Sequence, residues 1–243
     1  MHVQVEADFA RFLGYEDAVF FSAGFLANTG VLQTLAAPGT LILSDERNHA
    51  SIIDGCRLAK ASGASVSVYR HRDPSHVDEL LGRHDGNALV VTDGLFSMDG
   101  TLALVPELLA VCRAHGAALM VDDAHGTGTL GATGRGIIEH FELRDDLPDI
   151  LVATASKALG VEGGAVAASA PVAALLRQKA RPFVYSTSST PATCAAVSAA
   201  VGVLEGGQSP VAALHRNIQR LAAHLGMGEW PSPIIPVPVG DEA

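Results

Sequence analysis

Short apolar runs alternate with amphipathic segments along this chain, and this alternation constrains the possible fold more than any other feature. The run 117–121 is apolar throughout, which is typical of a strand buried on both faces of a parallel sheet. We therefore expect an α/β fold with three layers (α/β/α), in which helices cover a mostly parallel sheet. The expected strands span residues 17–21, 40–43, 65–69, 87–92, 117–121, 150–154 and 163–168, and the expected helices 24–36, 48–61, 106–115, 192–204 and 211–225.

The two ends of the chain suggest an incomplete protein. Helix-like sequence follows residue 1 within a few positions, with no strand before it, and residues 233–239 read as a strand that runs into a turn and stops. We expect residues 1–228 to form one large domain and residues 229–243 to begin a second, truncated domain.

Charge and composition exclude several classes of function. The formal net charge of −10 argues against binding to nucleic acid or to an anionic membrane surface. The longest apolar stretch, 192–204, is too short to span a bilayer, and Glu6 and Asp8 do not fit a signal peptide. Three cysteines far apart read as buried thiols in a reducing compartment, so a soluble cytoplasmic protein is expected; they are Cys56, Cys112 and Cys194.

Lys157 differs from the other two lysines of the chain. Lys60 and Lys179 lie near the ends of amphipathic helices, whereas Lys157 follows the strand 150–154 among small residues that leave room for a bulky adduct. In an α/β sheet, ligands collect at the carboxyl ends of the strands. Partial desolvation there would make the amine a nucleophile; the alternative is a surface lysine whose stem packs on apolar neighbours.

Two aspartates and a histidine follow the strand 117–121. Asp122 is placed to point into a cleft, where a carboxylate can hold a proton on a heterocyclic nitrogen, as pyridoxal 5′-phosphate (PLP) requires. The alternatives are a capping aspartate with a hydrogen-bonded His125, or a metal site, which we do not expect because no further acidic or histidine cluster lies nearby. The G-x-G-x-x-G run at 126–131 does not directly open a helix, so it is not read as a dinucleotide site.

Small and hydroxyl-bearing residues supply candidate phosphate ligands. Gly24 and Phe25 form a turn between a strand and a helix, and Thr154 ends another strand. Ser186 and Thr187 belong to a hydroxyl run before a helix. A plain turn and helix capping are the alternatives.

Two further side chains stand where they could meet a planar ligand. His49, at a helix start, could stack on a ring or simply be solvated, and Ser97, after the strand 87–92, could reach a phenolic oxygen or bond within its own turn.

Together these motifs resemble the α-oxoamine synthases, PLP enzymes of the aspartate-aminotransferase fold type (fold type I). The match covers the chain nearly end to end, in family order, at residues 22–25, 48–51, 96–99, 121–126, 154–157 and 185–187. Residues 125–128, 134–136, 139–141 and 162–164 resemble the members that serve biotin biosynthesis, while 48–57 and 92–100 equally resemble glycine C-acetyltransferases.

The resemblance implies a role for each residue that faces the cofactor ring. Lys157 would attach the cofactor and later move the substrate Cα proton, and Asp122 would pair with the pyridinium nitrogen. His125 and Ser97 would contact the phenolic oxygen, and His49 would stack on the ring.

The resemblance also assigns the cofactor phosphate. Backbone N–H groups of Gly24 and Phe25, with the Thr154 hydroxyl, would hold it within one subunit. Ser186 and Thr187 would reach the phosphate of the neighbouring subunit, which implies a homodimer with shared active sites.

The implied activity is a decarboxylative condensation of an amino acid with an acyl thioester, giving an amino ketone, CO₂ and free thiol. The biotin-type members use L-alanine with pimeloyl-CoA or a pimeloyl carrier protein; glycine acetylation is the alternative. Members carry further segments before Met1 and after Ala243, including the arginine that grips the substrate carboxylate. A catalytically silent fragment that folds or dimerises is therefore a third hypothesis.

Overall fold

A single seven-stranded sheet forms the centre of the computed structural model, which describes residues 1–206, 210–237 and 239–240. The strand order is β1-β7-β6-β5-β4-β2-β3, and β7 runs antiparallel to both of its neighbours while the other pairs are parallel. The strands are β1 (Asp17–Phe21), β2 (Leu41–Asp45), β3 (Ser65–Tyr69), β4 (Ala88–Asp93), β5 (Ala118–Asp122), β6 (Ile150–Thr154) and β7 (Gly164–Ala168).

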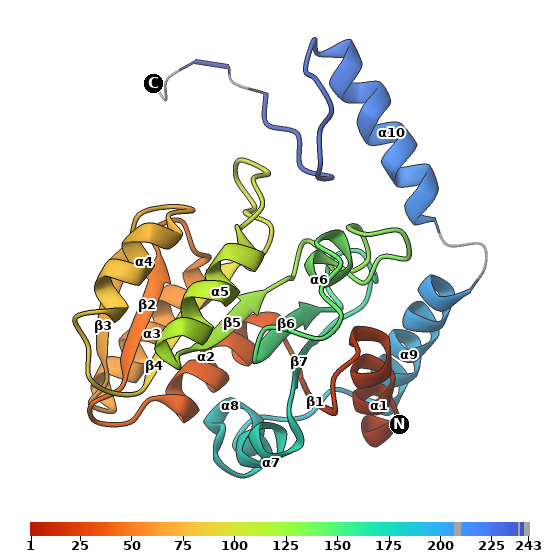
Figure 1. Ribbon diagram of the computed structural model, residues 1–243. Helices are drawn as coiled ribbons and strands as arrows, with labels where there is room; N and C mark the ends of the chain where they lie inside the picture. The colour runs from red at the N-terminus through yellow and green to blue at the C-terminus, as the bar shows by residue number, and fades with distance from the viewer. Residues whose placement is uncertain (207–209, 238, 241–243) are drawn as a thin grey trace.

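Helices cover both faces of the sheet and complete the three layers (Figure 1). One hydrophobic core lies under α2 (Gly24–Leu35), α3 (Ala50–Ala61) and α7 (Ala170–Lys179). The other core takes its helical residues from α1 (His2–Leu13), α4 (Pro74–Leu81), α5 (Val105–His115), α6 (Ile137–His140), α9 (Pro191–Glu205) and α10 (Val211–His224). The short helix α8 (Arg181–Val184) packs against α2 and α7.

Alternation along the central strands explains why both faces are buried. In β5, Leu119 and Val121 belong to one core and Met120 to the other. In β6, Leu151 and Val152 divide in the same way. Successive side chains of a strand point to opposite faces, so a strand that is apolar throughout needs cover on both sides. The expected α/β/α architecture is confirmed.

The carboxyl ends of the parallel strands meet at one edge of the sheet. Asp93, the last residue of β4, is the Cα partner of Asp122, the last residue of β5. Asp122 in turn pairs with Val152 of β6. This register places the polar residues that follow these strands beside one another.

The segment 233–239 was predicted to be a strand, and this is wrong for its described residues. Proline lacks the N–H that a ladder needs, and this segment contains Pro233 and Pro236. The carbonyl of Ile234 instead accepts local bonds from Trp230 Nε1 and Ser232 Oγ, and Ser232, just before the segment, also donates to Gly100 O. Residues 238 and 241–243 of the predicted second domain lie outside the described residues, and the domain division stays a prediction.

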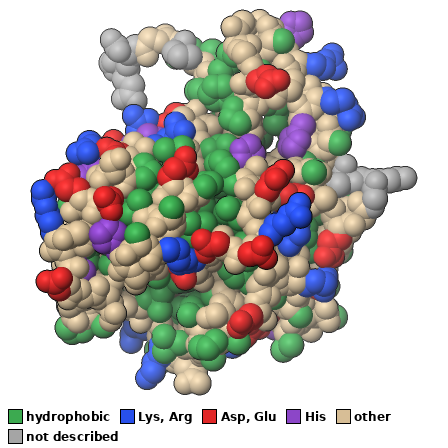
Figure 2. All heavy atoms as spheres, viewed as in Figure 1, with side chains coloured by type: hydrophobic (Ala, Val, Ile, Leu, Met, Phe, Trp, Pro, Cys, Tyr) green, Lys and Arg blue, Asp and Glu red, His purple; other side chains and the backbone are tan. Residues whose placement is uncertain are grey.

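The surface mixes charges of both signs. On the face seen in Figure 2, acidic and basic side chains are interspersed. Arg113, for example, pairs with Asp146 and Asp149 at 2.9 Å. The three cysteines are buried and unpaired, as expected. Within the described parts of the chain, no helix combines the length and apolarity that crossing a membrane requires.

Candidate active site

A cavity of about 230 Å³ lies at the carboxyl ends of β4, β5 and β6. Seven of the ten residues predicted for the site line it, namely Gly24, Phe25, His49, Asp122, His125, Thr154 and Lys157. The other lining residues are Ala23, Asn28, Ser51, Asp93, Leu95, Ala124 and Ser156. The fold therefore brings together groups that lie far apart in the sequence, from the start of α2 to the loop after β6.

Asp122 forms the buried floor of the cavity. Its Oδ2 accepts a hydrogen bond of 2.6 Å from Asn28 Nδ2, and its Oδ1 accepts one of 3.0 Å from Ala124 N. Burial raises the pKa of the Asp122 carboxyl, while these two bonds and the nearby Lys157 and His49 oppose that rise. A carboxylate held in this way can keep a proton on a ring nitrogen above it.

A relay of hydrogen bonds fixes the ring of His49. Asn28 Nδ2 donates to Ser51 Oγ at 2.8 Å, and Ser51 N donates to His49 Nδ1 at 3.2 Å. The Ser51 hydroxyl lies 2.8 Å from the same ring nitrogen. Because Nδ1 accepts, the neutral ring carries its proton on Nε2. The same contact caps the N-terminus of α3.

Asn28 and Ser51 were not predicted from the sequence. Both are buried and lie on helices, where a polar residue has no distinctive local pattern. Their role depends on the packing of α2 against α3, and no signal in the sequence could have found them.

Asp93 was also missed, although a signal for it existed. It follows the apolar residues of β4 as Asp122 follows those of β5, so the rule that singled out Asp122 applies to it equally. Its Oδ2 accepts a bond of 3.1 Å from His49 N. Burial, followed by the neighbouring charge of Asp122, raises the pKa of Asp93 to about 9.

Lys157 and His125 lie on the open side of the cavity. Lys157 is exposed, so the predicted desolvation is wrong, because the loop after β6 carries this side chain to the solvent side of the site. His125 is half-buried, and burial, followed by the positive charge of Lys157, lowers its pKa. The lining of the cavity therefore includes an accessible amine and a buried carboxyl.

The turn before α2 closes tightly against the end of β6. A Cβ added to Gly24 would lie 3.1 Å from Thr154 Oγ1. The Thr154 hydroxyl donates to Gly163 O at 2.9 Å and accepts from Ser156 N at 3.3 Å. Since α2 begins at Gly24, the backbone N–H groups of its first turn have no partner within the helix, and such a turn suits an anion.

Three predicted residues lie outside the cavity lining. Ser97 is half-buried in the loop after β4, where Leu95 faces the cavity instead. Ser186 and Thr187 are exposed in the segment between α8 and α9. Their predicted contacts with the cofactor remain predictions.

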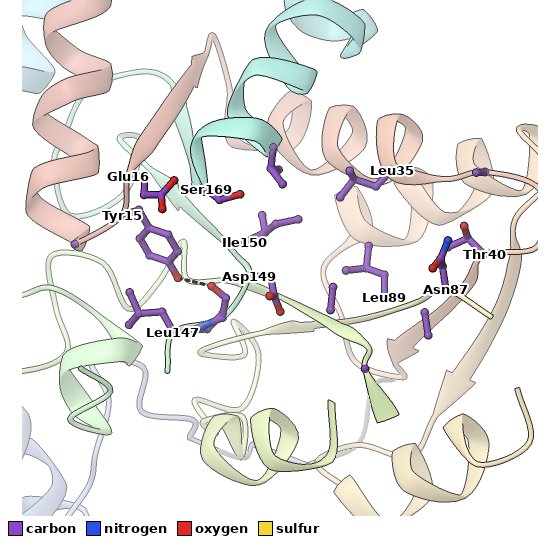
Figure 3. A pocket seen from close by; sticks show the side chains of 17 residues that line it. Tyr15, Glu16, Leu35, Thr40, Asn87, Leu89, Leu147, Asp149, Ile150 and Ser169 are labelled. Atoms are coloured by element: carbon purple, nitrogen blue, oxygen red, sulfur yellow. Dashed lines mark hydrogen bonds between the residues drawn. The ribbon is translucent and has the colours of Figure 1, made fainter. Parts of the chain in front are cut away.

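A larger cavity of about 630 Å³ lies at the opposite edge of the sheet, near the starts of β4, β5 and β6 (Figure 3). Three of its polar side chains have partners: Tyr15 donates to Pro148 O, Asp149 accepts from Leu119 N, and Glu16 accepts from Ala170 N. No lysine, histidine or cysteine is among the described residues that line it, so it lacks an amine that could attach a cofactor aldehyde.

Nothing in the described part of the chain gathers three or more potential metal ligands. The loop at 126–131 opens no helix, because α6 begins only at Ile137, in line with the reading that it is not a dinucleotide fingerprint.

The sheet topology is that of PLP-dependent enzymes of fold type I, as the match to solved structures of that class shows. The family model described as "Aminotransferase class I and II" matches residues 1–243, and the chain belongs to this family. Its relatives identify the branch as the α-oxoamine synthases, so the resemblance seen in the sequence is confirmed.

Among curated proteins, the chain is 45% identical over 248 residues to 8-amino-7-oxononanoate synthase of Pseudomonas putida, covering 100% of this chain and 63% of the relative. It is 42% identical over 284 residues to the biotin biosynthesis bifunctional protein BioWF of Corynebacterium kroppenstedtii, covering 100% of this chain and 39% of the relative. The chain thus spans less than two thirds of these relatives.

Solved structures agree. A serine palmitoyltransferase from S. paucimobilis with bound PLP and myriocin superposes with a TM-score of 0.86 at 33% identity, covering 93% of this chain and 56% of that one. An 8-amino-7-oxononanoate synthase from Francisella tularensis gives a TM-score of 0.79 at 32% identity, covering 96% and 68%.

Proposed function

We propose that this chain forms the PLP-binding part of an enzyme that condenses L-alanine with a pimeloyl thioester, the 8-amino-7-oxononanoate synthase reaction of biotin biosynthesis. The observation that carries the proposal is the single cavity that places the Lys157 amine, the Asp122 carboxyl and the His49 ring around one space. The names of the relatives support the choice of reaction.

The residues of the cavity fit the cofactor in chemistry. A buried carboxyl faces a pyridine nitrogen, an exposed primary amine suits an aldehyde, and Thr154 with the start of α2 suits a phosphate. Asn28 Oδ1 is also buried without a partner among the described residues. Such an unsatisfied atom in the lining favours a site built around a polar ligand.

The chain's own groups would then have distinct tasks. Lys157 would hold the cofactor and move the proton at the Cα of the amino acid. Asp122 would keep a proton on the ring nitrogen, and His49 would hold the ring from one face. When bound, PLP supplies an electron sink for the charge that develops at this Cα. The protein contributes position and charge.

The exposed Ser186 and Thr187 support the further proposal of a cytoplasmic homodimer in which each subunit completes its partner's phosphate site. Double substitution to alanine should then weaken PLP binding in the dimer. Mixing these subunits with Lys157→Ala subunits should restore one intact site per heterodimer.

The first experiment is a titration of the purified chain with PLP. We expect a visible absorbance band that Lys157→Ala abolishes, whereas Lys179→Ala, at the exposed end of α7, keeps it. A folded chain without the band contradicts cofactor attachment at Lys157.

The second experiment identifies the product. Alanine with pimeloyl-CoA should give 8-amino-7-oxononanoate, whereas turnover of glycine with acetyl-CoA favours the acetyltransferase alternative. A chain that binds PLP but forms neither product behaves as the silent fragment.

A further inference from the structure

Two carboxyl groups, not one, end neighbouring strands at the floor of the cavity. Asp93 and Asp122 are Cα partners across β4 and β5, so their side chains leave the same face of the sheet. Both are buried, at 5% relative exposure each, and both line the cavity. Two like charges so placed and so poorly solvated cannot both be ionised without a large cost.

The surroundings of the two carboxyls are unequal. Asp122 accepts two hydrogen bonds, from Asn28 Nδ2 and Ala124 N, and the positive charge of Lys157 favours its ionised form. Within the described chain, Asp93 accepts a single bond, from His49 N. Bonds and cations that favour the ionised form lower a carboxyl's proton affinity, so a shared proton belongs on Asp93.

We propose that Asp93 carries a proton at neutral pH. The neutral Asp93 carboxyl lets Asp122 stay ionised opposite the cofactor ring, and Asp93 itself holds the backbone of His49. Asp93 is thus a positioning residue that acts through its two neighbours. The part of this inference that concerns the ring rests on the proposed function. The protonation of Asp93 itself is a property of the chain without cofactor.

The remaining titratable groups around Asp93 are consistent with this arrangement. Asp45, at the end of β2, adds negative charge and raises the pKa of Asp93 further, as Asp122 does from β5. The other titratable groups that line the cavity, besides Asp122, are His49 at the start of α3, His125 after β5 and Lys157 after β6. Of these, Lys157 and His49 act on Asp122.

The test is carbon-13 NMR of the cofactor-free chain with labelled aspartate carboxyl carbons. In wild type, the assigned Asp93 resonance should stay at the position of a protonated acid at pH 7 and titrate near pH 9, while Asp122 should already be ionised. This titration is measured on the wild-type chain, so the test does not depend on whether a variant folds. Two ionised carboxyls, or a protonated Asp122 beside an ionised Asp93, would overturn the proposal.

Two isosteric variants test the protonation of Asp93 and of Asp122 separately. In Asp122→Asn, Asp93 should remain protonated at pH 7 but titrate at lower pH, because the neighbouring charge is gone. In Asp93→Asn, Asp122 should be ionised at pH 7; a protonated Asp122 there contradicts the proposal. Asp123→Asn assigns the resonance of the neighbouring buried carboxyl, whose pKa burial raises to about 8.

Failure of this inference and failure of the proposed function give different results. If PLP does not attach to Lys157, the absorbance titration fails while the carboxyl titrations are unchanged. If Asp93 is ionised at pH 7, the carboxyl titration fails while the band of Lys157 still forms.

Discussion

The side-chain amide of Asn28 lies 2.6 Å from the carboxylate of Asp122, and the same nitrogen lies 2.8 Å from Ser51 Oγ. One nitrogen on α2 thus orients the carboxyl at the end of β5 and the hydroxyl on α3 that fixes His49. Two groups proposed to contact the cofactor ring, Asp122 at its nitrogen and His49 on one face, are therefore coupled through one residue.

Substitution of Asn28 by alanine should weaken cofactor binding. A hydrogen bond to a charged group contributes about 1.5–3 kcal/mol, so PLP affinity should fall by about tenfold or more. The comparison is the dissociation constant from absorbance titration of Asn28→Ala and of Gln33→Ala, elsewhere on α2. Equal affinities in the two variants would show that Asn28 does not orient Asp122.

The sequence predicted the sheet well because its central strands are apolar on both faces. The bounds of β1, β3 and β6 match the predicted ranges, and Lys157 and Asp122 were found because each follows such a strand. Helix α4 was not predicted, although Asp73 caps it and Pro74 stands in its first turn. It has only eight residues, too few for a clear apolar periodicity.

The part of the site that could not be predicted depends on tertiary packing. Asn28 and Ser51 acquire their roles only because α2 and α3 lie side by side beneath the end of β5. The exposure of Lys157 likewise follows from the path of a loop, which short-range pattern does not encode. A reactive residue at the end of a strand can be recognised from its neighbours in the sequence. The residues that form hydrogen bonds with it come from distant parts of the chain and cannot.

Gly136 should not tolerate a side chain. Its φ is +82° with ψ −151°, and an added Cβ would lie 1.8 Å from Asp123 Oδ2. The Gly136→Ala variant should lose about 3 kcal/mol or more of unfolding free energy, from backbone strain and overpacking together.

The matched control is Gly116→Ala, because Gly116 also has a positive φ of +64° but no atom within 4 Å of the added Cβ. It should cost only about 1 kcal/mol, the ordinary penalty of a left-handed residue. Urea denaturation of both variants measures the difference, and similar losses would show that contact with Asp123 does not matter.

Arg177 ties α7 to the first strand. Its guanidinium bonds to Asp17 at 2.6 and 2.8 Å, to Ala18 O at 2.7 Å and to Glu6 at 3.0 Å, and this pairing, as the largest cause, lowers the pKa of Asp17. Arg177→Ala should destabilise the chain by about 2 kcal/mol, because it removes a bidentate, half-buried pair.

Arg57 is the control for this prediction. It pairs with Asp54 one helical turn away, at 2.6 Å, and its side chain is 74% exposed. Arg57→Ala should change the unfolding free energy by less than about 0.5 kcal/mol. A loss in Arg177→Ala no larger than this would mean that the link between α7 and β1 is not stabilising.

The stability of the cofactor-free chain should fall as the pH rises above 7. Burial raises the pKa of Asp123 to about 8, from a usual value of 3.8, so between these values the folded chain holds a proton that the unfolded chain has released. Stability then decreases with pH by up to about 1.4 kcal/mol per pH unit, until the folded carboxyl ionises. The lowered pKa values of His125 and His140 act in the opposite direction, but only below about pH 7, where the unfolded histidines take up protons.

Urea midpoints between pH 7 and 9 measure the effect. Asp93, whose pKa is raised to about 9, contributes a slope of the same sign, so Asp123→Asn, which cannot ionise, should reduce the slope between pH 7 and 8 without abolishing it. An unchanged slope in that variant would show that Asp123 is already ionised in the folded chain at pH 7.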